Sequence, residues 1–240
     1  MTNLPLSINK TVKYIQQRLI GKFHDNLRCL MLYGSWVKGT ARKDSDIDLL
    51  VIFNGVNADA RRLLSGIEGE VAEDRSITLL SASVEEFQRE KIPLYTAVKK
   101  EGKIIMGEAD TTLNPEPPRI KYADCFEKSK QFETKKVEMA ENVLKEYPSY
   151  GSADLCFVAS KHAIQMALAM EGIGYSSKVA VLLPLAKENL GKAIAGKFKK
   201  LFELYIRSEY SIESLSPEEA RRAVKYAKDI LSMCYRPKSA

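Results

Sequence analysis

Residues 47–53 read Ile-Asp-Leu-Leu-Val-Ile-Phe, and this run constrains the fold more than any other part of the chain. Every residue in it except Asp48 is apolar, and Asn54-Gly55 ends it. A strand that lacks polar alternation has both of its faces buried. We therefore predict a central strand in a sheet that helices cover on both sides.

The residues around this strand alternate between helical and strand patterns. Apolar side chains at helical spacing predict a first helix over 8–24. Further helices are expected over 59–71, 84–90 (with Ser83 as N-cap) and 93–101, and further strands over 27–33, 76–80 and 103–106. The first 110 residues are therefore expected to form a mixed β-sheet with flanking helices.

The second half of the chain shows no convincing strand. Three prolines, Pro115, Pro117 and Pro118, indicate a linker over 111–119. Helical periodicity then predicts helices over 124–145, 153–171, 178–189, 192–205 and 217–233, the last opened by Ser216-Pro217-Glu218-Glu219. We predict an α+β fold: a domain over 1–110, the linker, and an all-α helical bundle over 120–240.

Composition limits the class of protein. No apolar run approaches the roughly 18–20 residues of a membrane helix, and the N-terminus shows no signal-peptide pattern. The four cysteines are far apart and there are two histidines, which argues against a zinc site. We expect a cytoplasmic protein with reduced thiols. The net charge of +6 suits phosphate-bearing ligands, nucleotides or nucleic acid, without choosing between them.

Two carboxylates stand where the central strand begins. Asp46 and Asp48 are two residues apart, so on a strand their side chains point to the same face. Two neighbouring negative charges on an apolar sheet are costly unless a cation lies between them. Oxygen ligands without His or Cys favour Mg²⁺ or Mn²⁺. We therefore predict a divalent metal ion held by Asp46 and Asp48.

A second motif precedes the carboxylates by ten residues. The strand over 27–33 ends at Gly34-Ser35, and a turn from there into a short helix would present backbone N–H groups to an anion. Lys38, Arg42 and Lys43 add positive charge to the connecting loop. A triphosphate could therefore lie between this turn and the metal ion.

The stretch from Tyr33 to Leu49 resembles the minimal nucleotidyltransferase family of the DNA polymerase β superfamily. That signature joins an apolar residue and Gly-Ser to two acids that alternate with apolar residues, and the resemblance extends over residues 8–108. It implies that the nucleotide, with ATP as the expected donor, is bound by Gly34, Ser35, Lys38, Arg42 and Ser45, and that Asp46 and Asp48 are the catalytic metal ligands.

The chain departs from this family at one position. Active members carry a third carboxylate on the next strand, often the base that activates the acceptor hydroxyl, and the equivalent position here is Thr78. Other acids near that strand, Glu73, Asp74, Glu85 and Glu86, do not fit the expected register. The site is therefore one carboxylate short of the pattern found in active members of the family.

The helical half resembles a HEPN domain, and the whole chain resembles the kanamycin nucleotidyltransferase-like architecture. The resemblance implies a homodimer through the helical domain. Ribonuclease members carry a histidine soon after an arginine, but no histidine follows Arg207, so we expect no RNase activity. In related toxin–antitoxin pairs a HEPN tyrosine accepts AMP, which makes Tyr210 a candidate for self-modification.

Two further side chains leave alternatives open. Trp36 directly follows the phosphate turn and either stacks on a base or anchors the turn in the core. His162 lies on the apolar stripe of its helix and is either a core or interface residue or part of a cleft.

The sequence thus supports two functions. The first is transfer of a nucleoside monophosphate from an NTP to a hydroxyl acceptor, on a small molecule or a protein. The second is a nucleotide-binding regulatory or antitoxin-like protein that acts through partner contacts.

Overall fold

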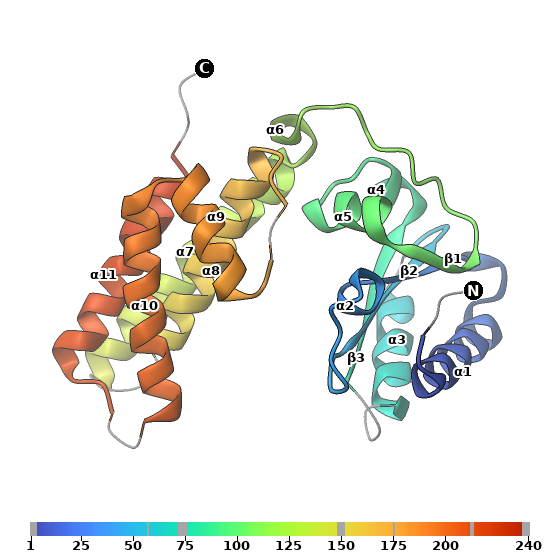
Figure 1. The fold of residues 1–240 in the computed structure, drawn as a ribbon, viewed down its shortest axis with the longest axis horizontal. Helices are drawn as coiled ribbons and strands as arrows, with labels where there is room; N and C mark the ends of the chain where they lie inside the picture. The colour runs from blue at the N-terminus through green and yellow to red at the C-terminus, as the bar shows by residue number, and fades with distance from the viewer. Residues whose placement is uncertain are drawn as a thin grey trace. The chain divides into compact units, whose positions relative to one another are not determined.

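The computed structural model describes residues 4–56, 58–71, 76–147, 152–174, 176–211 and 214–236. The chain divides into two compact units, residues 1–115 and 116–240. Figure 1 shows a sheet flanked by helices in the first unit and helices alone in the second. The predicted α+β fold class is therefore confirmed. The acids Glu73 and Asp74 lie outside the described residues.

The first unit contains a four-stranded mixed sheet. Its strands are β1 (Leu27–Tyr33), β2 (Ile47–Phe53), β3 (Ile77–Ser83) and β4 (Lys103–Gly107), in the order β3-β2-β1-β4. β1 is antiparallel to β2 and to β4, whereas β2 and β3 are parallel. Every residue of β2 except Asp48 is buried, as expected for a central strand with both faces covered.

Helices cover both faces of this sheet (Figure 1). α1 (Leu6–Phe23), which the 3-10 turn η1 (His24–Asn26) joins to β1, packs with α3 (Ala58–Val71) on the face that carries Leu49 and Val51. α4 (Val84–Gln88) and α5 (Pro93–Glu101) pack on the face that carries Leu50 and Ile52. Because side chains alternate along a strand, Asp48 points to the same face as Leu50 and Ile52.

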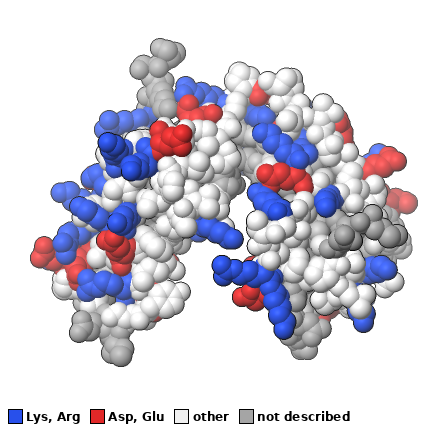
Figure 2. Space-filling view, viewed as in Figure 1, with Lys and Arg blue, Asp and Glu red and all other residues white. Residues whose placement is uncertain are grey.

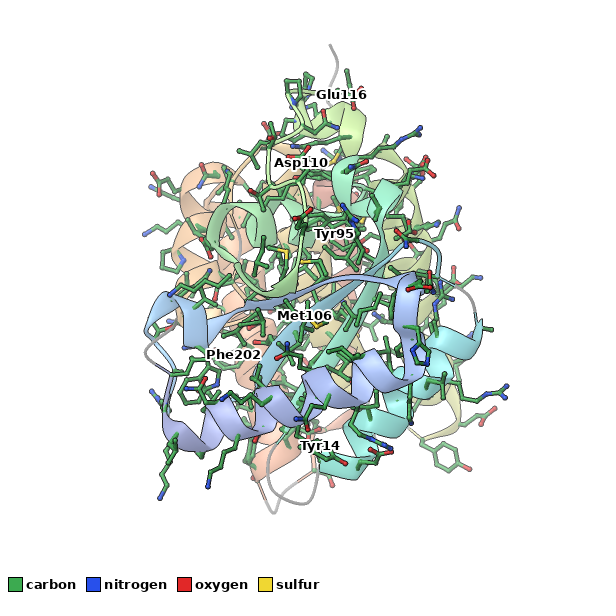
Figure 3. The ribbon with its side chains drawn as sticks, turned by 90° about the vertical axis from the view of Figure 1, so that its right-hand side faces the viewer. Tyr14, Tyr95, Met106, Asp110, Glu116 and Phe202 are labelled. Carbon is green, nitrogen blue, oxygen red and sulfur yellow. The ribbon has the colours of Figure 1, made fainter. Side chains whose placement is uncertain are left out.

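A charged cluster joins α1 to α3. Arg18 Nε and Nη2 donate to the two carboxylate oxygens of Glu70 at 2.7 and 2.5 Å. Tyr14 of α1, labelled in Figure 3, donates its hydroxyl to Glu70 at 3.2 Å. The hydrogen bonds from Arg18 lower the pKa of Glu70 to about 2. This cluster fixes the position of one helix along the other.

A buried ion pair fastens the segment after β4 to the first unit. Lys99 Nζ lies 3.2 Å from Glu90 Oε1, with the two side chains 1% and 0% exposed. Lys99 also donates to the carbonyl oxygens of Gln88 and Thr112, at 3.0 and 2.7 Å. Glu90 accepts the backbone N–H of Asn114 at 2.6 Å. Part of the proline-rich segment that we predicted as a linker is thus held against the first unit.

The second unit is a helical bundle. Its helices are α6 (Pro118–Lys121), α7 (Ala123–Glu146), α8 (Ser152–Met170), α9 (Val179–Asn189), α10 (Lys192–Tyr210) and α11 (Pro217–Cys234). α8 is buried on most of its sides and packs against α7, α10 and α11. Phe157 of α8 stacks on Tyr205 of α10, with ring centroids 4.4 Å apart. None of the helices described here is long and apolar enough to cross a bilayer.

Lys and Arg side chains gather over α10 and α11 (Figure 2). Several of them pair with acids: Lys197 Nζ lies 2.5 Å from Asp229, and Arg207 Nη1 lies 2.6 Å from Glu219. This pattern of paired charges is typical of a solvated helical face.

Candidate active site

The site begins where β1 ends beside the start of β2. In the register of these antiparallel strands, Tyr33 is the partner of Asp48. Gly34 follows with φ 77° and ψ −149°, a conformation that is essentially restricted to glycine. A Cβ atom at Gly34 would overlap Oδ2 of Asp48 and lie 3.1 Å from its Cγ. The absent side chain therefore lets the backbone approach the carboxylate.

Gly34 leads directly into a helix of one turn, α2 (Ser35–Lys38). The N–H of Lys38 donates to the Gly34 carbonyl at 3.2 Å, and the N–H of Thr40 donates to the Ser35 carbonyl at 3.1 Å. Gly39 ends the helix in the left-handed conformation, with φ 69°. Glycines at both ends thus produce the tight turn that the sequence predicted after Gly34-Ser35.

The loop from α2 to the carboxylates is held by its own hydrogen bonds. The N–H of Arg42 donates to Ser45 Oγ at 2.8 Å, and the N–H of Ser45 donates to the Arg42 carbonyl at 3.1 Å. The indole N–H of Trp36 donates to the Ser45 carbonyl at 3.2 Å, and the ring packs against the core. Of the two alternatives for Trp36, these contacts favour the anchoring one, and they fix Ser45 directly before Asp46.

Asp46 and Asp48 lie close enough to interact electrostatically. Asp46 is exposed and directly precedes β2, whereas Asp48 is half-buried within it. Burial raises the pKa of Asp48, and the negative charge of Asp46 raises it further. Both effects disfavour the ionised form of Asp48 in the absence of a counter-charge, so a cation beside these oxygens would be stabilised.

The donor set fits a hard divalent cation. Two carboxylates suit Mg²⁺, which typically takes one or two of them and completes its shell with water and substrate phosphate. Among the residues that the structure describes, no group of three or more His, Cys, Asp or Glu could hold a metal ion. Because Gly34 has no side chain, its backbone lies directly beside the Asp48 carboxylate.

Asp48 has Tyr33 of β1 as its neighbour on one side and Thr78 of β3 on the other. The parallel register of β2 and β3 pairs Asp48 with Thr78, which is half-buried. Thr78 therefore occupies the position where the family resemblance led us to expect a third carboxylate. Glu86 instead caps α4, its carboxylate accepting the Ser83 N–H at 3.0 Å. At about 3.3 Å per residue, Ser83 lies roughly 17 Å along β3 from Thr78.

The three basic residues near the turn have different surroundings. Lys38 Nζ lies 2.8 Å from Oε2 of Glu101, the last residue of α5. Arg42 and Lys43 are exposed. Sequence reasoning did not identify Glu101, because no motif marks the end of this helix. The only available signal was its place just before Gly102-Lys103 at the start of β4.

The residues singled out in the helical unit have separate environments. His162 is about half-exposed, and its Nδ1 lies 3.2 Å from Oε1 of the buried Glu133. Arg207 is paired with Glu219, and Tyr210 is 77% exposed at the end of α10. These contacts within the second unit assign no chemistry to His162 or Tyr210.

Comparison with known proteins covers most of the chain. Residues 14–111 match the family model of the polymerase beta nucleotidyltransferase, and residues 134–237 match that of the HEPN domain. No curated protein matches the chain.

One solved structure has a similar fold at low sequence identity, and a second aligns less well. Spectinomycin adenyltransferase from Enterococcus faecialis, crystallised with ATP and spectinomycin, aligns over 93% of this chain and 99% of that one, with 14% identity and a TM-score of 0.53. A nucleotidyltransferase-like protein from Exiguobacterium sibiricum 255-15 aligns over 94% of this chain and 74% of that one, with 11% identity and a TM-score of 0.43. By the two family models, the chain joins a polymerase beta nucleotidyltransferase domain over residues 14–111 to a HEPN domain over residues 134–237.

Proposed function

We propose that this protein transfers a nucleoside monophosphate from an NTP, with ATP as the expected donor, to a hydroxyl group in a reaction that depends on Mg²⁺ or Mn²⁺. The main support is the contact between Gly34 and Asp48. Any side chain at Gly34 would overlap the Asp48 carboxylate, so the glycine allows the backbone of the turn to lie directly beside the two acids at the start of β2. A backbone turn next to two carboxylates is an arrangement that suits a triphosphate with its metal ion.

In this reaction the acceptor oxygen forms a bond to the α-phosphorus of the NTP. The bond from the α-phosphorus to the oxygen that bridges to the β-phosphate breaks, and pyrophosphate leaves with that electron pair. The proton of the acceptor hydroxyl passes to a base or to water. Gly34 and Ser35 hold the outer phosphates, while Lys38 and Arg42 offset their negative charge.

Asp46 and Asp48 would hold the divalent ion. When bound, this ion neutralises phosphate charge and helps to orient the α-phosphate for in-line attack. Ser45 keeps the preceding loop closed, through the hydrogen bond that its hydroxyl accepts from the Arg42 N–H. Its expected role is therefore to position Asp46.

The acceptor belongs to one of two classes, a small hydroxylated molecule or a protein hydroxyl. The similar structure of an adenyltransferase with ATP and spectinomycin makes small polyhydroxylated molecules the first class to test. Exposed Tyr210 makes the protein itself the second. A homodimer through the helical unit is part of the same proposal.

The experiment is a pyrophosphate-release assay with each NTP, Mg²⁺ or Mn²⁺, and a panel of acceptors. We expect metal-dependent release that the double variant Asp46→Ala/Asp48→Ala abolishes. Asp44→Ala, which removes an exposed acid from the same loop, is the matched control and should retain release. Equal release by the wild type and the double variant would exclude this site as the catalytic one.

Thr78 supports a second candidate function, a nucleotide-binding regulatory protein that acts through partner contacts. A threonine beside Asp48 can neither bind a metal ion as a carboxylate nor act as a base near neutral pH. Metal-dependent NTP binding without turnover on any acceptor would favour this function over transfer.

A further inference from the structure

Lys38, expected at the phosphates, is held by a carboxylate from another element. Its Nζ lies 2.8 Å from Glu101 Oε2, with the two side chains 49% and 48% exposed. Glu101 is the last residue of α5. The ion pair thus links the end of α2 to the start of β4, on the side of β1 opposite to β2.

The strand register brings Glu101 beside the phosphate turn. Lys103 of β4 pairs with Leu32 of β1 in antiparallel register. This pairing brings the start of β4, and with it the end of α5, beside the end of β1. Asp48 borders the same turn from β2. The turn at Gly34 therefore lies between Asp48 on the β2 side and the end of α5, which carries Glu101, on the β4 side.

Gly102 fixes the course of the backbone next to Glu101. Its N–H donates to the Val98 carbonyl at 2.7 Å. A Cβ at Gly102 would lie 2.5 Å from that carbonyl oxygen and 3.3 Å from Cε of Met31. The backbone at the end of α5 is therefore closely packed, so that Glu101 is presented to Lys38 from a defined position.

We propose that Glu101 is a competing anion for Lys38, which a bound triphosphate or pyrophosphate displaces and which takes Lys38 back on release. This inference rests on the proposed function of the same site. An exposed pair such as Lys38–Glu101 is weak, so phosphates of higher charge exchange with it readily. Glu101 thereby positions Lys38 before the nucleotide binds and lowers the affinity for pyrophosphate, the leaving product.

The test is calorimetric titration of pyrophosphate, and of α,β-methylene ATP, into the full chain with Mg²⁺. We expect Glu101→Gln to bind both about twofold to fivefold more tightly, the range that an exposed ion pair can supply. Lys38→Gln should bind both more weakly. In the Lys38→Gln background, Glu101→Gln should have no further effect, because the competition needs both partners.

Glu108→Gln is the matched control. Glu108 is also an exposed acid in a weak ion pair, with Arg28 at 3.6 Å, but it follows the other end of β4. It should leave both affinities unchanged, which separates competition for Lys38 from a general change in net charge.

Three results would overturn the inference while leaving the proposed function standing. They are unchanged or weaker binding by Glu101→Gln, an equal gain in Glu108→Gln, and a full gain that persists in the Lys38→Gln background. A wild-type protein that binds neither ligand would overturn the proposed function and this inference together.

Discussion

Two glycines with positive φ enclose the single turn of α2, and they differ in what they face. Gly34, at φ 77°, touches the Asp48 carboxylate, whereas a Cβ at Gly39, at φ 69°, would meet no heavy atom within 4 Å. At both positions, a residue with a side chain would be strained, because the backbone has a positive φ. At Gly34 a side chain would also collide with Asp48, a predicted metal ligand. Substituting each glycine in turn therefore distinguishes the effect of backbone strain from the effect on the site.

Gly34→Ala should therefore reduce the affinity for an ATP analogue by about tenfold or more, because the new methyl group displaces Asp48. Gly39→Ala should cost roughly 1–2 kcal/mol of folding stability through backbone strain and change the affinity little. Calorimetric titration and urea unfolding of both variants measure the two effects. Equal affinities in the two variants would contradict the role given to Gly34.

Thr78 supplies the second residue-scale prediction. Thr78→Asp would place a carboxylate beside Asp48, and a general base typically contributes a factor of 10²–10⁴ to a rate. If the missing base limits transfer, pyrophosphate release should rise by about tenfold or more. Thr78→Asn is the matched uncharged control. Equal rates in these two variants would show that a carboxylate at this position does not supply the missing chemistry.

At the scale of elements, the sequence predicts the long apolar segments well and the short ones poorly. The run over 47–53 predicted β2 with its bounds, because an uninterrupted apolar strand is easy to recognise. β3 continues to Ser83 rather than residue 80, since polar Ser81 and Ser83 hide its end from a hydrophobic pattern. α6 begins inside the segment predicted as a linker and ends two residues beyond it, and the sequence did not predict it because four residues carry no readable periodicity.

The same contrast holds for the candidate site. The family resemblance identified Thr78 as the position equivalent to the third carboxylate, and the parallel register of β2 and β3 places it beside Asp48. The Lys38–Glu101 pair joins positions on separate elements, α2 and α5. Only the pairing of β1 with β4 brings them together, and no local pattern in the sequence encodes that contact.

The start of α11 supplies an element-scale prediction about pH. Glu219 accepts the N–H of Ser216 at 3.0 Å and a hydrogen bond from Arg207 at 2.6 Å. The Ser216 N–H, followed by Arg207, lowers the pKa of Glu219 to about 2. Because the pKa is lower in the folded state, this stabilisation is present above the unfolded value, about 4.3, and is lost as the pH falls towards 2.

Glu219→Gln should therefore lower the free energy of unfolding at pH 7, and its difference from the wild type should shrink as the pH approaches 2. Urea unfolding across this range measures the difference. Glu218→Gln changes a neighbouring acid in the same first turn and is the control. If both variants differ from the wild type equally at every pH, the cap does not stabilise α11 in this way.

At the scale of the whole molecule, the chain consists of two compact units. The Lys99–Glu90 pair holds residues 108–115, the segment that follows β4, to the first unit. Asp110, labelled in Figure 3, lies on this segment. The pair is buried. Lys99 donates to the Thr112 carbonyl and Glu90 accepts the Asn114 N–H, and both of these residues follow the last strand of the sheet. The desolvation of a buried pair offsets much of its attraction, but removing one partner alone is strongly destabilising.

Lys99→Met should cost about 3–5 kcal/mol of stability in the first unit, because it leaves the charge of Glu90 buried without its partner. The double variant Glu90→Gln/Lys99→Met should recover part of this loss, since no charge is then buried. Urea unfolding of the full chain measures both. A loss below about 1 kcal/mol in Lys99→Met would contradict the buried geometry of the pair.

The central claim is that Gly34, Asp46 and Asp48 form one site for a metal ion and a nucleotide. Its most direct test is calorimetric titration of α,β-methylene ATP, with and without Mg²⁺, into the wild type and into Asp46→Asn/Asp48→Asn. We predict binding that requires Mg²⁺ in the wild type and is lost in the double variant. Binding of equal strength with and without Mg²⁺, or binding that the double variant retains in full, would contradict the claim.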